Sequence, residues 1–276
     1  MNTEKTTEKK ILFTDMDGTL LRNDSTVSPE MKLTLDRMMD CGHKLVLTSG
    51  RPLDSILEAA RLSGLLRPGT LVIAYNGSLV YDCALQHPIL ERTLPFETAS
   101  EIFRLAGALS IHAQTYTDHE IVCPREDEEI RYYRRRIHLP LLTADDPLSL
   151  LSHPPYKVHT IHLTDRTKLL KLREQVLSRF GDTVTAQFSN DRYLEFYSAQ
   201  SGKGNAIRWV CGHFGIPISQ SLAAGDAPND ISMLEAAGVG IAMANASEDV
   251  KKAADFITAA DNDQDGLIEA VEAYLR

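Results

Sequence analysis

The sequence has few cysteines and no long apolar segment. Its 4 cysteines form no C-x-x-C pair, so a disulfide framework is not expected, and free thiols in a reducing compartment fit best. No stretch approaches the roughly 18 apolar residues of a membrane-spanning helix. The first residues, MNTEKTTEKK, contain no apolar signal-peptide core. These features predict a cytoplasmic protein that does not insert into a membrane.

Basic residues are scarce relative to acidic ones. The chain has 29 lysines and arginines against 38 aspartates and glutamates, which gives a formal net charge of -9. An acidic surface repels nucleic acids and anionic lipids, so neither is an expected partner. It also repels phosphorylated small molecules, so any site that binds one must supply its own local cations.

Apolar runs alternate with helical segments at both ends of the chain. Near the N-terminus, strands are predicted at 11–15, 44–50 and 71–77, with helices at 28–40 and 52–63 between them. The C-terminal part repeats this order, with helices and strands predicted at 203–214, 221–226, 229–236, 239–246 and 266–275. Strands that are apolar on both faces and separated by helices are typical of a parallel sheet. The expected fold class is therefore α/β, with a Rossmann-like core built from both ends of the chain.

The middle of the chain has a different pattern. Short strand pairs, several helices and a proline-bearing loop at 140–155 indicate a compact α+β unit. We predict that residues 84–197 form a cap domain, inserted into a core that comprises residues 1–83 and 198–276.

Two carboxylates follow the first strand directly. One residue separates Asp15 from Asp17 in the segment DMDGT, so both side chains can face one site at the carboxyl edge of the sheet, where α/β proteins bind ligands. One acid can act as a nucleophile while the other moves a proton. Gly18 allows the backbone to approach a ligand closely.

Three further segments place polar groups after a strand or before a helix. Ser49 and Gly50 follow the second strand, and the hydroxyl of Ser49 can donate to a phosphate oxygen. Lys203 precedes a late helix and can neutralise phosphate. The segment GDAPND contains Asp226 and offers the carboxylates that Mg²⁺ prefers. Together the four segments supply a nucleophile, a proton donor, a metal site, a hydroxyl and a lysine, which are the parts that phosphoryl transfer requires.

The order of DMDGT, SGR, a lysine and GDAPND resembles the haloacid dehalogenase superfamily of phosphatases. The insertion between the second and third motifs resembles the Cof-type branch, which has a C2B cap. The segments NGSLV and DQDGLIEAVEAYL are similar to that branch as well. From Lys10 onward, the resemblance implies a Mg²⁺-dependent phosphomonoester hydrolase. Its substrates would be small phosphorylated metabolites, such as sugar phosphates or phosphorylated cofactors, and it would act through an aspartyl-phosphate intermediate.

The resemblance also implies a role for each matching residue. Asp15 would attack phosphorus, and Asp17 would protonate the leaving alcohol and then activate water. The residues implied for phosphate and substrate binding are Ser49, Gly50, Lys203 and Asn229. Those implied for the metal are Asp15, Asp17 through its backbone carbonyl, Asp226, and Asp230 in support of the metal's waters or of Lys203.

Two other functions stay open. A phosphomutase or phosphotransferase of the same fold would also use paired acids, but it would yield a phosphorylated product instead of free phosphate. A non-catalytic regulatory binding module is the second alternative. The complete set of motifs argues against it, since such a module would be expected to have lost an acid or the lysine.

A calcium-loop pattern occurs near the C-terminus. The segment DNDQDG at 261–266, followed by Glu272, fits D-x-D-x-D-G-x₅-E. A helix normally precedes such a loop, whereas residues 254–258 are predicted to form a short core strand. We therefore expect at most adventitious cation binding there.

Three other clusters have both a functional and a structural interpretation. Acids and arginines at 126–136 are predicted to form a solvated helix face instead of a patch that reads the substrate. His159 and His162 lie on opposite faces of a predicted strand, which argues against a zinc pair. Tyr193, Glu195 and Tyr197 alternate along a predicted strand and therefore share one of its faces. This face either lines the cleft between cap and core or packs internally.

Overall fold

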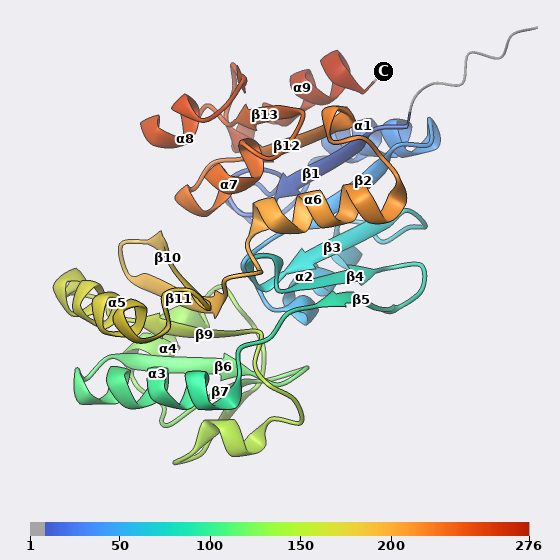
Figure 1. Ribbon diagram of the computed structural model, residues 1–276. Helices are drawn as coiled ribbons and strands as arrows, with labels where there is room; N and C mark the ends of the chain where they lie inside the picture. Colours follow the sequence, from blue (N-terminus) through green and yellow to red (C-terminus); the bar gives the residue numbers. More distant parts are fainter. Residues whose placement is uncertain (1–8, 276) are drawn as a thin grey trace, which may run out of the picture.

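The computed structural model describes residues 9–275, and the larger of its sheets has the strand order β14-β13-β12-β1-β2-β3-β4-β5 (Figure 1). The strands are β1 (Ile11–Asp15), β2 (Lys44–Thr48), β3 (Thr70–Ala74), β4 (Leu79–Asp82), β5 (His87–Glu91), β12 (Ser221–Gly225), β13 (Val239–Ala242) and β14 (Phe256–Ile257). From β14 to β3 all neighbours are parallel, and β4 and β5 are antiparallel. Because β1 pairs with β12, the two ends of the chain form one core, and the predicted α/β fold is confirmed.

Helices cover both faces of this sheet because its strands are apolar on both sides. Leu12 packs in one buried cluster, and its neighbours Ile11 and Phe13 pack in another on the opposite face. The first cluster includes α1 (Pro29–Asp40), α2 (Leu53–Leu62) and α9 (Leu267–Tyr274). The second includes α6 (Lys203–Phe214), α7 (Ile231–Leu234) and α8 (Glu248–Lys252). Within residues 9–275, no helix combines the length and apolar character needed to cross a membrane.

The predicted start of the first helix is confirmed. The Ser28 hydroxyl accepts a hydrogen bond from the backbone N–H of Met31 at 2.9 Å, and Pro29 occupies the first turn, where its missing N–H costs nothing.

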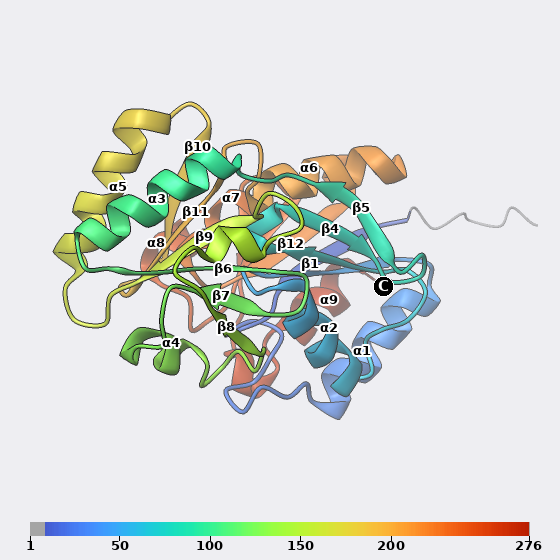
Figure 2. The same cartoon turned by 90° about the horizontal axis from the view of Figure 1, so that it is seen from below.

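The inserted unit contains a second sheet of order β10-β11-β9-β6-β7-β8. Its strands are β6 (His112–Tyr116), β7 (Ile121–Cys123), β8 (Leu141–Thr143), β9 (Lys157–Ile161), β10 (Val184–Asn190) and β11 (Tyr193–Ser198). One face packs against α3 (Phe96–Ala108) and α5 (Arg166–Phe180), and α4 (Glu128–Tyr133) lies on the other (Figure 2). This arrangement confirms an α+β cap beside an α/β core.

The structure differs from the sequence prediction in several places. Residue 84 was predicted to begin the cap, but β5 pairs with β4 in the larger sheet, and its Ile89 and Leu90 pack against the core. We propose that the cap begins after Arg92 and ends near Ser198. The region 140–155, predicted as a loop, contains β8 and a short 3₁₀ turn. The predicted helix at 229–236 divides into a 3₁₀ turn and α7, and α8 was not predicted.

The calcium-loop-like segment is tied to the first loop of the core. Asp263 accepts from the backbone N–H of Asn23 at 2.7 Å, and Asp265 forms an ion pair with Arg22 at 2.7 Å. These carboxylates are directed to protein partners and do not converge on one point. The predicted short strand before the segment is confirmed as β14.

Candidate active site

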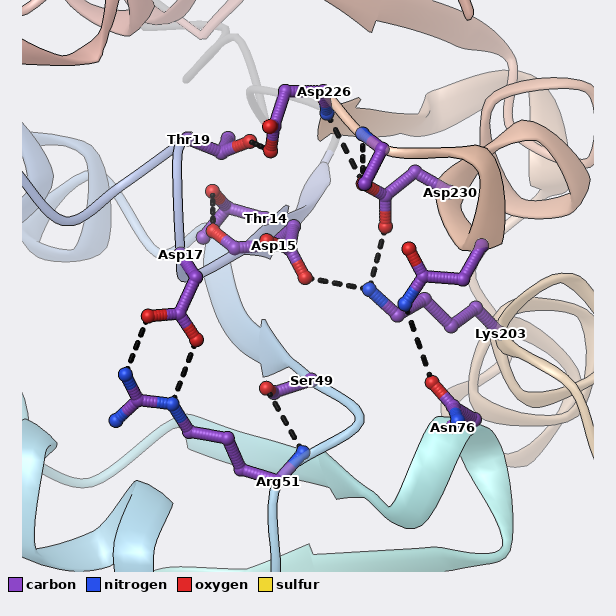
Figure 3. A network of polar contacts seen from close by, with 12 residues as sticks. Thr14, Asp15, Asp17, Thr19, Ser49, Arg51, Asn76, Lys203, Asp226 and Asp230 are labelled. Carbon is purple, nitrogen blue, oxygen red and sulfur yellow. Dashed lines mark hydrogen bonds and ion pairs between the residues drawn. The ribbon is translucent and has the colours of Figure 1, made fainter. Parts of the chain in front are cut away.

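Polar side chains from both ends of the chain meet at the carboxyl edge of the larger sheet. Asp15 is the last residue of β1, Ser49 follows β2, and Asp226 follows β12. These three strands are neighbours, and Lys203 at the start of α6 reaches the same edge (Figure 3). The parallel topology therefore assembles residues from all four sequence segments.

Lys203 is a buried cation between two buried carboxylates. Its Nζ donates to Asp15 Oδ1 and to Asp230 Oδ1, each at 2.5 Å, and its side chain is 1% exposed. Burial lowers the pKa of Lys203, but the two carboxylates outweigh burial and raise this pKa overall. The other oxygen of Asp230 accepts from the backbone N–H groups of Asp226 and Ala227 at 3.0 Å. Asp230 is thus fixed, and Lys203 stays protonated.

Three acids form a group that could bind a metal ion. Asp15, Asp226 and Asp230 each place one carboxylate oxygen within 4.8 Å of the others. Burial, and then the charge of Asp230, raise the pKa of Asp15 well above its usual range; the same causes raise the pKa of Asp226 to about 7. One lysine does not neutralise three carboxylates. The excess charge and the oxygen-only donor set fit a hard divalent cation such as Mg²⁺.

Gly18 lets the first loop pass directly beside Asp226. Its φ of 80° lies in the left-handed region, and a Cβ there would stand 2.5 Å from Asp226 Oδ2. The next residue, Thr19, donates its hydroxyl to Asp226 Oδ1 at 2.9 Å. The sequence suggested close approach to a ligand at Gly18; the structure shows close approach to a carboxylate of the acidic group.

Asp17 is held apart from the acidic group by Arg51. The Arg51 guanidinium forms a two-pronged ion pair with the Asp17 carboxylate, with Nε donating to Oδ2 at 2.7 Å and Nη2 donating to Oδ1 (Figure 3). The Asp17 side chain is 43% exposed and faces the cavity, whereas the Arg51 side chain is largely buried. The sequence analysis gave Arg51 no role, although it follows Ser49 and Gly50 directly. A guanidinium fork of this kind fixes the orientation of a carboxylate.

Replacing Arg51 with Gln is expected to lower kcat for an aryl phosphate about tenfold, because Asp17 would lose its orientation. KM should change less. The R51K variant should fall between wild type and R51Q, since it keeps the charge but not the fork. Steady-state kinetics would measure both. Arg61→Gln, at an exposed position on α2, is the matched control, and an unchanged kcat in R51Q would contradict a positioning role for Arg51.

The other residues predicted to bind phosphate line the same cavity as Asp15. The hydroxyl oxygen of Ser49 accepts from a backbone N–H at 3.1 Å, which leaves its proton free to be donated. Asn229 donates its amide to Asn76 Oδ1 at 3.3 Å. The buried Oδ1 of Asn229 has no partner among the described residues. Gly50 contributes its backbone to the cavity wall.

A buried ion pair joins the cap to this site. Lys157 on β9 pairs with Glu195 on β11, and their side chains are 2% and 4% exposed. Lys157 Nζ also donates to the backbone carbonyl of Gly50 at 2.6 Å, and Asn76 Nδ2 donates to Glu195 Oε2 at 3.0 Å. Burial raises the pKa of Glu195, but Lys157 outweighs it and lowers this pKa to about 2. We call Lys157, Glu195 and Asn76 the cap latch.

The sequence gave only an indirect signal for the cap latch. The sequence drew attention to Glu195 because it alternates with Tyr193 and Tyr197. In the structure these three residues have different environments. Tyr193 and Glu195 line the cavity, whereas Tyr197 is buried and donates to Gln187. Lys157 was not recognised, because a lysine in a strand is usually solvated.

The cap closes one side of a cavity of about 310 Å³ whose floor is Asp15. Its cap wall includes Tyr133, Arg136 and His159. Residues 126–136 were predicted to form a solvated face; Arg136, just after the end of α4, is exposed and also lines the cavity. His159 is buried, which lowers its pKa to about 3, so it is neutral. His162 does not line the cavity.

The chain matches the family model of the haloacid dehalogenase-like hydrolases over residues 12–271. It is similar to a solved haloacid dehalogenase-like hydrolase from Bacteroides thetaiotaomicron, with 29% identity, a TM-score of 0.87, and coverage of 96% of this chain and 99% of that one. The Thermotoga maritima structure TM0651 is 28% identical with a TM-score of 0.80, over 96% and 97% of the two chains. The 5-amino-6-(5-phospho-D-ribitylamino)uracil phosphatase YwtE of Bacillus subtilis is 26% identical, over 96% of this chain and 98% of that protein.

Proposed function

The chain belongs to the haloacid dehalogenase-like hydrolases, and from that premise we propose that it hydrolyses small phosphate monoesters through a phosphoryl group carried transiently on Asp15. The observation that carries this proposal is the setting of Asp15. Lys203 binds one of its carboxylate oxygens, and the side chain lines the cavity beneath the cap. A carboxylate fixed in this way is oriented for attack on a group bound in the cavity.

In the first step, a carboxylate oxygen of Asp15 forms a bond to phosphorus while the bond from phosphorus to the ester oxygen breaks. Asp17 enters this step protonated, with one carboxyl oxygen turned from Arg51 to the departing oxygen, and gives its proton to that oxygen, which leaves as an alcohol. Ser49 donates its hydroxyl proton to a phosphate oxygen, and Lys203 balances the charge of Asp15. The cap excludes bulk water from the cavity during this step.

In the second step, water attacks phosphorus and the bond to the Asp15 oxygen breaks. Asp17, now a carboxylate, takes the proton from the water. Inorganic phosphate leaves, and Asp15 returns as a free carboxylate beside Lys203. Arg51 keeps the Asp17 side chain at the cavity between the two steps.

Mg²⁺ is the cofactor we propose, and it would supply positive charge to the phosphate and to the acidic group. Asp15 and Asp226 would bind it, together with the backbone carbonyl of Asp17. Asp230 would support its waters, because both of its carboxylate oxygens already have partners in Lys203 and the backbone. The raised pKa values of Asp15 and Asp226 are the signature of a site that lacks positive charge.

Mg²⁺ is expected to stabilise the protein more strongly at pH 8 than at pH 5. In the metal-free protein, the pKa of Asp226 is about 7, whereas an unfolded aspartate has a pKa of about 4. The contribution of Asp226 to stability is therefore full below about pH 4 and is lost as the pH rises towards 7. Mg²⁺ binds the deprotonated form, so its benefit grows over the same range. We expect a rise in Tm of about 5 °C at pH 8 with Mg²⁺ at about 100 times Kd.

Thermal melts with Mg²⁺ or EDTA at each pH would measure this effect. Asp226→Asn should reduce both the Mg²⁺ response and the pH dependence of the metal-free protein. Asp249→Asn, on the exposed side of α8, should leave both unchanged. A Mg²⁺ response that is equal at pH 5 and pH 8 would count against the acidic group as the metal site.

A phosphate-release screen over phosphorylated metabolites tests the reaction class. Free phosphate from a single substrate would support hydrolysis. A phosphorylated isomer formed without free phosphate would support the phosphomutase alternative instead. No release from any ester, including aryl phosphates, would contradict the proposed function.

A further inference from the structure

A second hollow lies on the cap next to the active-site cavity. It has a volume of about 510 Å³, and its lining comprises three arginines, one carboxylate (Asp191), and Tyr132, Asn190 and Tyr193. The arginines are Arg135, Arg136 and Arg192. We call it the arginine hollow. Its arginines come from the end of α4 and from the turn between β10 and β11, so two separate segments bring them together. This is a local concentration of positive charge on a protein whose net charge is -9.

The arginines of this hollow are not neutralised by carboxylates. Within residues 9–275, Arg135, Arg136 and Arg192 form no ion pair with an acid. The one carboxylate in the lining, Asp191, pairs with Arg166, which lies outside the hollow. Because the positive charges remain available, the hollow can attract an anion.

Aromatic side chains hold part of this cluster in place. Arg192 donates from Nη1 to the Tyr132 hydroxyl at 2.9 Å, and its guanidinium lies 5.2 Å from the centre of the Tyr132 ring. The Arg135 guanidinium lies 5.6 Å from the centre of the same ring. Tyr193 packs edge-on against Tyr132 with ring centres 6.4 Å apart. Guanidinium groups arranged around an aromatic ring lose less freedom when they bind an anion.

The arginine hollow adjoins the cavity that contains Asp15. Arg136, Asn190 and Tyr193 line both spaces. A phosphate placed at Asp15 would direct its leaving group along the cap wall towards these shared residues. A leaving group that extends past these shared residues would meet the guanidinium groups of the hollow.

We propose that the arginine hollow is a second anion subsite, and that the substrates are phosphate esters whose leaving group carries another phosphate or a carboxylate at its far end. This inference rests on the proposed function and specifies its substrate class. Arginine forms paired hydrogen bonds with phosphate and with carboxylate alike, so both anions have the required chemistry. The three arginines together would select such esters over neutral ones.

Matched substrates test the subsite in the wild-type protein. Fructose 6-phosphate and glucose 6-phosphate have neutral far ends, whereas fructose 1,6-bisphosphate has a phosphate and 6-phosphogluconate a carboxylate there. We expect kcat/KM to be about tenfold higher for one or both of the substrates with an anionic far end than for the neutral ones. A preference for only one of the two would identify which anion the hollow takes. Equal values for all four, with ready hydrolysis of an aryl phosphate, would overturn the subsite and leave the proposed function standing.

Variants separate a built subsite from general electrostatic attraction. Arg192→Gln, at a position that lines the hollow and not the active-site cavity, should remove the preference while leaving hydrolysis of an aryl phosphate within about twofold of wild type. Arg136→Gln should also remove the preference. Arg136→Lys should lose most of the preference, because lysine keeps the charge but cannot form the paired bonds. Arg125→Gln removes an exposed cap arginine outside the hollow and should have no effect. If R136K keeps the full preference, or R125Q loses it, long-range attraction explains the result and the subsite is wrong.

Binding of these compounds to an inactive variant tests the subsite without depending on turnover. In the Asp15→Asn protein, calorimetry should show tighter binding of fructose 1,6-bisphosphate or 6-phosphogluconate than of fructose 6-phosphate, by about tenfold, and R136Q should abolish the difference. If wild type hydrolyses nothing yet this difference is present, the proposed reaction fails while the anion subsite stands. Equal affinities would overturn the subsite.

Discussion

Asp15→Asn is expected to reduce Mg²⁺-dependent hydrolysis of an aryl phosphate by about 10³-fold or more, because an amide oxygen is a poor nucleophile towards phosphorus. Asn has nearly the same shape as Asp, so it can still accept a hydrogen bond from Lys203. The loss would therefore report on the chemistry at this carboxylate. In wild type, acid quenching during turnover followed by peptide mass spectrometry should detect a phosphoryl group on the peptide that contains Asp15.

The stability of this variant separates a chemical defect from unfolding. Asp15 has a raised pKa because it is buried beside Asp230 and Asp226, so neutralising it relieves repulsion in the metal-free protein. The Tm of metal-free D15N at pH 8 should therefore equal or exceed that of wild type. Asp145→Asn, at an exposed position in the cap, serves as the control and should retain full activity. Substantial turnover by D15N, or failure to find the adduct, would overturn the covalent mechanism.

The cap latch is expected to produce the largest effect on stability. Lys157→Met leaves the buried Glu195 carboxylate without its counter-charge. Glu195→Leu likewise leaves the buried ammonium group of Lys157 without a counter-charge. Removing one partner of a buried ion pair typically costs about 3 to 5 kcal/mol. Urea unfolding should show a loss of this size in each single variant. Glu101→Gln, which breaks exposed pairs with Arg104 and Arg179, should cost less than about 1 kcal/mol.

The double variant Lys157→Met/Glu195→Leu distinguishes stability from positioning. Two apolar side chains leave no uncompensated charge, so most of the lost stability should return. Activity should not return with it, because the Gly50 carbonyl then lacks its donor Lys157 and the Asn76 amide lacks its acceptor Glu195. We expect kcat/KM to stay about tenfold below wild type. Additive losses of stability in the double variant would show that the pair is not coupled, and full activity would show that the latch does not position the site.

Much of the core could be predicted from local sequence patterns. Each motif follows a strand or begins a helix, and strand order in a parallel α/β sheet brings the carboxyl ends of neighbouring strands together. For that reason the segments that contain Asp15, Ser49, Lys203 and Asp226 were predicted to meet, and the structure places them at one edge. The strand β5 was assigned to the wrong unit because a hairpin that extends a sheet has the same pattern as one that leaves it.

The partners that complete the site could not be predicted in this way. Arg51 and Asp17 are 34 residues apart, Lys157 and Glu195 are 38 apart, and Lys157 and Gly50 are 107 apart. No short motif encodes such pairs, because each depends on how two segments pack. Arg136 is a similar case: an exposed arginine just after a charged helix gives no sign that the helix ends at a cavity.

By itself, the sequence determined the family, the α/β core with its α+β cap, and the residues that could carry phosphoryl transfer. These features are local, since they depend on hydrophobic periodicity and on short segments at the ends of strands. Only the tertiary structure decided what surrounds those residues: the fork on Asp17, the buried latch between cap and core, and the arginine hollow beside Asp15. The physical reason is that burial and charge pairing arise from the packing of distant segments. Asp15 is therefore identified by its motif, while the setting that would select its substrate is formed by the fold.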